Sequence, residues 1–189
     1  MIKRYVGYEE LREALESSIT AETVFVCVGS SKITFDIFGP LMGELLKLRG
    51  VPYYGDYTRN VNAITMHDML NKIYKVDERK NKNIIALDAA VTDNDDEKNV
   101  IIFKKGQGVK PGAGVGKNFP VIGHNSILLF TLTNTELQQT MKYYKKSLNI
   151  GKKHDLSSLV QIRRHAVRVA DMIAEIYNKA CDSEQVTQF

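Results

Sequence analysis

The 189-residue sequence has no tryptophan and only two cysteines. Cys27 lies inside the apolar run VFVCVG, which favours a buried free thiol, and Cys181 lies far from it in the sequence. Two distant cysteines do not form the disulfide framework that small secreted domains use. A chain of this length buries roughly 70% of its unfolded surface, so its core needs no covalent staple.

Long apolar runs are also absent. No segment approaches the roughly 20 apolar residues of a membrane-spanning helix, so we expect no membrane partner. Lys3 and Arg4 are followed by further charged residues instead of the apolar stretch of a secretory signal peptide. We therefore expect a cytoplasmic protein in a reducing compartment.

The charge balance is only mildly basic. The sequence has 26 Lys and Arg against 22 Asp and Glu, a net charge of +4, and 43% of its residues are hydrophobic. This is ordinary globular composition, and it gives no reason to expect a nucleic-acid partner. Residues 142–168 hold eight basic residues and one Asp, a local net charge of +7. This segment is either a solvated face or a docking surface for an acidic partner or nucleic acid, and a homo-oligomer remains open.

Apolar runs alternate with amphipathic segments along the chain. We expect strands at 24–29, 51–57, 83–89, 99–106 and 126–132, and helices at 8–17, 39–50, 62–75, 135–148 and 156–181. This order predicts an α/β fold, a three-layer α/β/α sandwich with a mostly parallel sheet. Because only a turn separates 83–89 from 99–106, we expect these two strands to form an antiparallel hairpin.

We expect the whole chain, residues 1–189, to form a single domain. Its motif-bearing core spans about 20–132, and a helical C-terminal segment spans 135–181. In open α/β sheets the active site lies beyond the carboxyl ends of the strands. That rule directs attention to the loops that follow the strands 24–29, 83–89 and 99–106.

Two aspartates follow apolar strands at this edge. Asp36 lies seven residues after the first strand, where it is either a helix cap or a functional carboxylate. Asp88 ends the apolar run IIALD, where it either caps a loop or points into the crevice. If both share one site, one keeps a proton at neutral pH, and the pair has the base and the acid that hydrolysis needs. Two carboxylates with an imidazole would alternatively hold a divalent metal.

His124 and a glycine-rich loop complete the candidate site. His124 precedes the strand 126–132 and is the best imidazole candidate, expected on the same side as the aspartates. The loop 106–120 contains VKPGAGVGK but fails the phosphate-loop pattern, because Pro111 and Asn118 stand where Gly and Ser or Thr are required. Its glycines allow close backbone approach to a peptide, so we expect the cleft to be lined by four residues of this loop. These are Gly112, Gly114, Gly116 and Lys117.

Three ordered motifs carry a family resemblance. The segments GSSKITFDIFGP, IIALDAA and GVKPGAGVGK resemble, in this order, motifs of the bacterial germination protease and of the shorter YyaC family of sporulation proteins. The match spans roughly residues 24–132, and the length resembles the YyaC family. The resemblance implies the fold of the hydrogenase-maturation peptidases. Phe35, which precedes Asp36, departs from the Gly or Pro that these relatives have there.

The resemblance implies peptide-bond hydrolysis by two aspartates that match Asp36 and Asp88, with His124 at the histidine position of the metal-binding relatives. It implies an endopeptidase of the forespore or spore, without a cofactor, that acts on a protein or peptide substrate such as the small acid-soluble spore proteins. Two alternatives stay open. One is a catalytically silent binding or regulatory protein on the same fold, and the other is a metal-dependent maturation peptidase. The sequence leaves the identity of any metal unknown.

Overall fold

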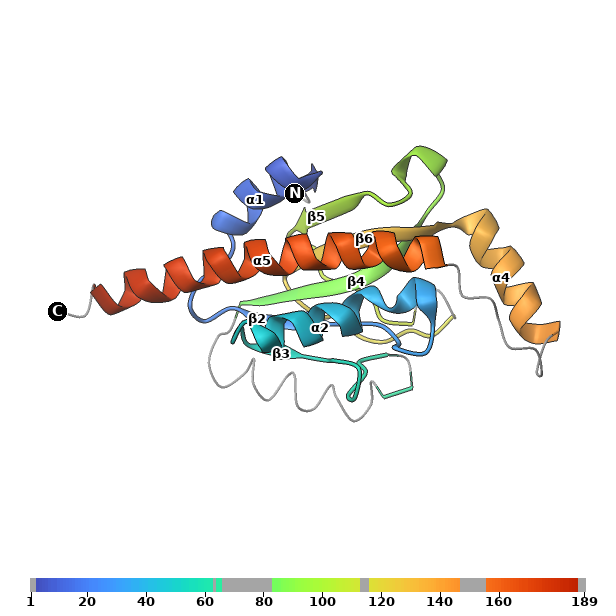
Figure 1. The fold of residues 1–189 in the computed structure, drawn as a ribbon, viewed down its shortest axis with the longest axis horizontal. Helices are drawn as coiled ribbons and strands as arrows, with labels where there is room; N and C mark the ends of the chain where they lie inside the picture. Colours follow the sequence, from blue (N-terminus) through green and yellow to red (C-terminus); the bar gives the residue numbers. More distant parts are fainter. Residues whose placement is uncertain (1–2, 63, 66–82, 113–115, 147–155, 187–189) are drawn as a thin grey trace.

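A computed structural model describes residues 3–62, 64–65, 83–112, 116–146 and 156–186 (Figure 1). The strands are β1 (Lys3–Val6), β2 (Val24–Cys27), β3 (Tyr53–Tyr54), β4 (Ile84–Thr92), β5 (Ile101–Lys105) and β6 (Asn125–Thr133). The α-helices are α1 (Tyr8–Glu16), α2 (Phe38–Leu48), α4 (Asn134–Lys146) and α5 (Leu156–Val186). Two short 3-10 helices are η1 (Thr34–Asp36) and η2 (Asp95–Glu97). Within these ranges, no helix has the length and apolar character to cross a lipid bilayer.

The six strands form one mostly parallel sheet in the order β1-β5-β6-β4-β2-β3. Strands β2, β3, β4 and β6 pair in parallel, while β5 pairs antiparallel with both β6 and β1. The predicted α/β class and mostly parallel sheet are therefore confirmed. The apolar composition of β2, β4 and β6 matches their central positions, where both faces of a strand are buried.

The predicted hairpin between 83–89 and 99–106 is wrong. Strand β6 lies between β4 and β5, so these strands run in opposite directions without pairing. Strand β1 was not predicted; it covers the free edge of β5. The predicted helix 62–75 lies almost entirely outside the described residues.

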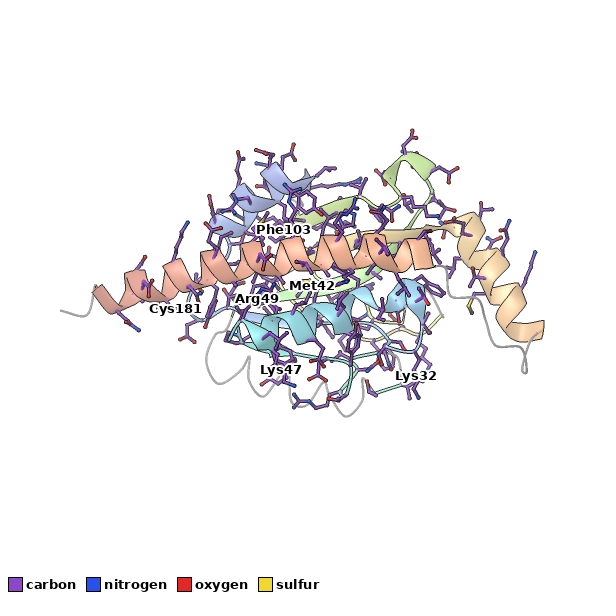
Figure 2. The ribbon with its side chains drawn as sticks, viewed as in Figure 1. Lys32, Met42, Lys47, Arg49, Phe103 and Cys181 are labelled. Atoms are coloured by element: carbon purple, nitrogen blue, oxygen red, sulfur yellow. The ribbon has the colours of Figure 1, made fainter. Side chains whose placement is uncertain are left out.

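Helices α1, α2 and α5 cover one face of the sheet. Figure 1 shows α5 crossing this face beside α2. Alternate residues of the central strands, such as Phe25 and Leu87, pack here against the helices in the larger of two apolar clusters. Met42 of α2 and Phe103 of β5, both labelled in Figure 2, are fully buried in this layer. The C-terminal helix α5 is thus part of the core, through residues such as Ile173.

The opposite face of the sheet carries a second apolar cluster. Here Val26, Ala86 and Leu128 pack against Val109 and Ile122, which flank the glycine-rich loop. Backbone hydrogen bonds in both directions join Val109 and Ile122, with N to O distances of 2.9 and 2.8 Å. The glycine-rich segment is therefore held on this face of the sheet by the packing of Val109 and Ile122.

Two glycines let α2 lie directly on the sheet backbone. A Cβ atom at Gly39 would meet the Val28 carbonyl oxygen at 1.8 Å, and one at Gly43 would meet the Gly55 carbonyl oxygen at 1.8 Å. No side chain fits at either position, because a Cβ needs more than 3 Å from backbone atoms. The spacing of four residues places both glycines on the same face of the helix.

We expect Gly43→Ala to lower the free energy of unfolding by about 1–3 kcal/mol, because the clash outweighs the better helix propensity of alanine. Urea unfolding followed by circular dichroism measures this effect. Lys47→Ala, one turn further along α2 on an exposed side chain, is the control and should change stability by less than about 0.5 kcal/mol. Equal stability of the two variants would contradict the close contact.

Candidate active site

The candidate site begins where β2 ends. Gly29 follows this strand with φ +142°, and a Cβ there would meet the Asp36 carbonyl oxygen at 2.3 Å. The Ser30 backbone N–H donates to that same carbonyl oxygen at 3.0 Å, so the loop 30–36 closes on itself. This closure brings Asp36, at the end of η1, back to the carboxyl end of β2.

Asp88 lies in the neighbouring strand β4. The strand pairs Cys27 with Leu87, so Asp88 is the first residue of β4 beyond the end of β2. Side chains alternate along a strand, and Asp88 has the same parity as Ala86, which belongs to the second apolar cluster. Asp88 therefore points to the sheet face opposite α1, α2 and α5.

Burial and charge keep protons on this pair of carboxyl groups. Burial raises the pKa of Asp36 to about 7, against an ordinary value of 3.8, and a backbone hydrogen bond from Ser30 opposes part of the rise. Burial also raises the pKa of Asp88 well above its ordinary value, and the negative charge of Asp36 raises it further, while a backbone hydrogen bond from Ala89 lowers it. When Asp36 is ionised, its charge favours the protonated form of Asp88.

Both aspartates line one pocket of about 450 Å³. Most of its remaining wall is apolar, with side chains from the segment that follows β2, from the loop 30–36, from β4 and from α4. These include Val28, Ile33, Phe35, Val91, Leu137 and Met141. The polar or charged lining residues besides the aspartates are Ser30, Asn62, Lys110, Lys117 and Thr131. An apolar wall with a few polar groups is typical of a substrate pocket.

The structure brings together only some of the residues chosen from the sequence. Asp36, Asp88, Gly112 and Lys117 line the pocket. Gly116 is exposed and is not among the lining residues, and Gly114 lies outside the described residues.

His124 lies apart from the aspartates. Its backbone N–H donates to the Ile84 carbonyl oxygen at 2.9 Å, at the amino end of β4, and its side chain is exposed. Four residues of strand, about 13 Å, separate Ile84 from Asp88. The expectation that His124 shares the side of the aspartates is therefore not met. His124 precedes β6 and so lies at the amino ends of the parallel strands, whereas Asp88 lies toward their carboxyl ends.

The sequence analysis missed the loop after β3, which supports the site. The buried Asp56 accepts hydrogen bonds from the backbone N–H groups of Thr58 and Arg59 at 2.9 and 2.7 Å. Burial acts to raise the pKa of Asp56, but these and other hydrogen bonds outweigh it and hold the pKa well below the ordinary range. The ordered loop carries Asn62 to the pocket and Asn60 to the loop 30–36. The motif DYTRN, a turn led by an aspartate, is the signal that could have indicated it.

The donors for a metal ion are few. Among the described residues no group of three or more His, Cys, Asp or Glu side chains gathers. Among the described residues that line the pocket, the side chains able to bind a metal are the two aspartates, and His124 lies at the other end of the strands. These described donors alone do not make up the carboxylates-plus-imidazole site of a metal-dependent maturation peptidase.

Comparison with known proteins identifies the family. The family described as "Protein of unknown function (DUF1256)" matches residues 2–163. The chain belongs to this family. It is 34% identical over 164 residues to the "Uncharacterized protein YyaC" of Bacillus subtilis (strain 168), which covers 74% of this chain and 78% of the relative. The resemblance to the YyaC family is thus confirmed, and Asp36 and Asp88 both lie inside the matched region.

The aspartate pair should make the stability of this DUF1256 protein depend on pH. The folded protein keeps protons that the unfolded chain has released above about pH 4, so the pair contributes less stability as the pH rises from about 4 through 7. We expect Asp36→Asn to raise the free energy of unfolding by on the order of 1–3 kcal/mol more at pH 8 than at pH 5. Urea unfolding at both pH values measures this difference.

Asp182→Asn, on an exposed position of α5, is the matched control. It should change stability equally at pH 5 and pH 8. If Asp36→Asn also had the same effect at both pH values, Asp36 would not titrate near neutrality and the pocket would not be buried as described.

Proposed function

We propose that this DUF1256 protein is an endopeptidase that hydrolyses peptide bonds through Asp36 and Asp88. The single observation that supports this most is that both carboxyl groups line one pocket, where burial and then the charge of Asp36 raise the pKa of Asp88. One carboxylate and one carboxylic acid in a largely apolar cleft are the base and the acid that amide hydrolysis requires.

In the proposed reaction the Asp36 carboxylate takes a proton from a water molecule while the oxygen of that water attacks the peptide carbonyl carbon. Asp88 donates its proton to the carbonyl oxygen, which gives a neutral tetrahedral intermediate. The carbon–nitrogen bond then breaks as Asp36 gives its proton to the leaving nitrogen and Asp88 recovers a proton from the hydroxyl group. The products are a carboxylic acid and an amine, and both aspartates return to their starting protonation states.

We also propose that the fold is the three-layer sandwich of the hydrogenase-maturation and germination peptidases, and that the protein acts in the forespore or spore cytoplasm of a spore-forming bacterium. The resemblance of the three motifs supports this, as does a relative from Bacillus subtilis. Small acid-soluble spore proteins are the substrates that the resemblance suggests. The exposed Arg163 and Arg164 of α5 favour a second candidate, a catalytically silent protein that docks an acidic partner.

We expect Asp36→Asn and Asp88→Asn each to lower the rate of cleavage of a small acid-soluble spore protein by about 10²–10⁴-fold while the fold is kept. Gel electrophoresis and mass spectrometry of the products measure cleavage, and circular dichroism measures folding. Asp182→Asn should cleave like the wild type. Undiminished cleavage by both active-site variants would contradict the aspartate mechanism, and a wild type that binds but never cleaves would favour the silent alternative.

The proposed mechanism also predicts a pH profile. Cleavage should rise as Asp36 ionises, around pH 7, and fall again once Asp88 loses its proton at higher pH. His124→Ala should leave the rate within about twofold, because this residue lies at the amino ends of the parallel strands, away from the aspartates. A profile that is flat from pH 5 to 9, or loss of cleavage in His124→Ala, would count against the pair acting alone.

A further inference from the structure

We infer that Thr131 is a positioning residue, whose hydroxyl holds the loop 30–36 so that Asp36 faces Asp88. This inference rests on the proposed function for its catalytic meaning, but the contacts that carry it are independent of any activity. Thr131 belongs to β6, which is the strand beside β4 and therefore beside Asp88. Its side chain is 4% exposed and lines the pocket.

The first observation is a hydrogen bond across the pocket wall. The Thr131 hydroxyl donates to the Phe35 carbonyl oxygen at 2.7 Å, over 96 positions of sequence. Phe35 directly precedes Asp36 within η1, a single 3-10 turn with no side-chain cap. Such a short turn has little stability of its own, so an outside contact decides where it lies.

The second observation is an irregularity in the sheet at the same residue. Ala90 pairs with Phe130, but the next residue of β4, Val91, pairs with Leu132. Thr131 is the residue that the parallel ladder skips, which makes it the extra residue of a β-bulge. Bulges re-aim a side chain and are frequent beside active sites. Here the register shift falls at Thr131, the residue of β6 whose side chain meets η1.

The other end of the loop has a matching contact. The Asn60 side-chain oxygen accepts from the Ser31 backbone N–H at 2.6 Å, and the Asn60 amide donates to the Ser31 hydroxyl at 3.1 Å. The loop with Asp36 is thus fixed at its start by Asn60 and at its end by Thr131. Both contacts come from segments that follow or belong to neighbouring strands, so the loop takes its position from the sheet.

The test measures the protonation of the pair directly. Thr131→Val keeps the shape and removes the hydroxyl, so the turn should move, Asp36 should become more solvated, and its influence on Asp88 should weaken. We expect the pKa of Asp36 to fall from about 7 toward its ordinary value near 4, and that of Asp88 to fall with it. Carbon-13 NMR titration of the aspartate carboxyl groups measures both. The variant keeps the other ionisable residues that line the pocket, Lys110 and Lys117.

Two variants separate the hydrogen bond from simple loss of packing. Thr131→Ser keeps the hydroxyl and should titrate like the wild type. Thr92→Val removes an equally buried threonine hydroxyl from the end of β4, where it donates to Glu97 at 2.8 Å, and should leave the aspartate titration unchanged. A wild-type titration of folded Thr131→Val would overturn the inference, as would an equal shift in Thr131→Ser.

A further variant keeps the test decisive if Thr131→Val does not fold. Asn60→Ala releases the other end of the loop and should lower the pKa of Asp36 in the same direction; an unchanged titration there would overturn the inference. With a cleaved peptide, Thr131→Val should lower kcat by about tenfold or more with KM within about threefold, and Thr131→Ser should restore kcat. If the wild type cleaves no peptide, the proposed function fails, while the titration still decides the role of Thr131.

Discussion

Two carboxyl groups share one largely apolar pocket, and they cannot both be ionised without a large cost in free energy. That constraint determines the chemistry available at the carboxyl edge of the sheet. Burial raises the pKa of both groups, and the charge of Asp36 adds to the rise at Asp88. Near neutral pH both effects favour a state in which one group is ionised while its neighbour holds a proton. An exposed pair would be doubly ionised at the same pH and would offer no acid.

The rest of the fold holds the two carboxyl groups in this arrangement. Asp88 is fixed by its strand, which pairs on both sides within the sheet. Asp36 is carried by a loop, and its position depends on close contacts that tolerate no side chain. Gly29 lies against the Asp36 carbonyl oxygen, and Gly39 lets the following helix rest on Val28. Burying two acids costs free energy, and the large apolar cluster beneath α5 contributes the stability that offsets this cost.

The sequence predicted the aspartates because strand direction alone determines which ends of parallel strands meet. Asp36 and Asp88 each follow an apolar run, and the carboxyl ends of β2 and β4 lie together. The same rule, applied to His124, places it at the amino ends of the strands, because it precedes β6 and does not follow a strand. The hairpin failed for a different reason, since pairing partners depend on which strand is most apolar on both faces, and β6 fills the central place beside β4.

The role of Thr131 could not be predicted from the sequence, because it depends on a contact with Phe35, which lies 96 positions away in the chain. Within the run SILLFTLT, regular alternation gives Thr131 the parity of Ile127 and Leu129, which pack under the helices. Thr131 is nevertheless a threonine, whose hydroxyl costs free energy to bury without a partner, and the Phe35 carbonyl oxygen is its acceptor. A valine of the same shape would fill the space but leave that carbonyl without this donor. The polar residue in a buried strand is therefore explained by the loop it holds, and the geometry of Asp36 depends on a residue 95 positions away in the chain.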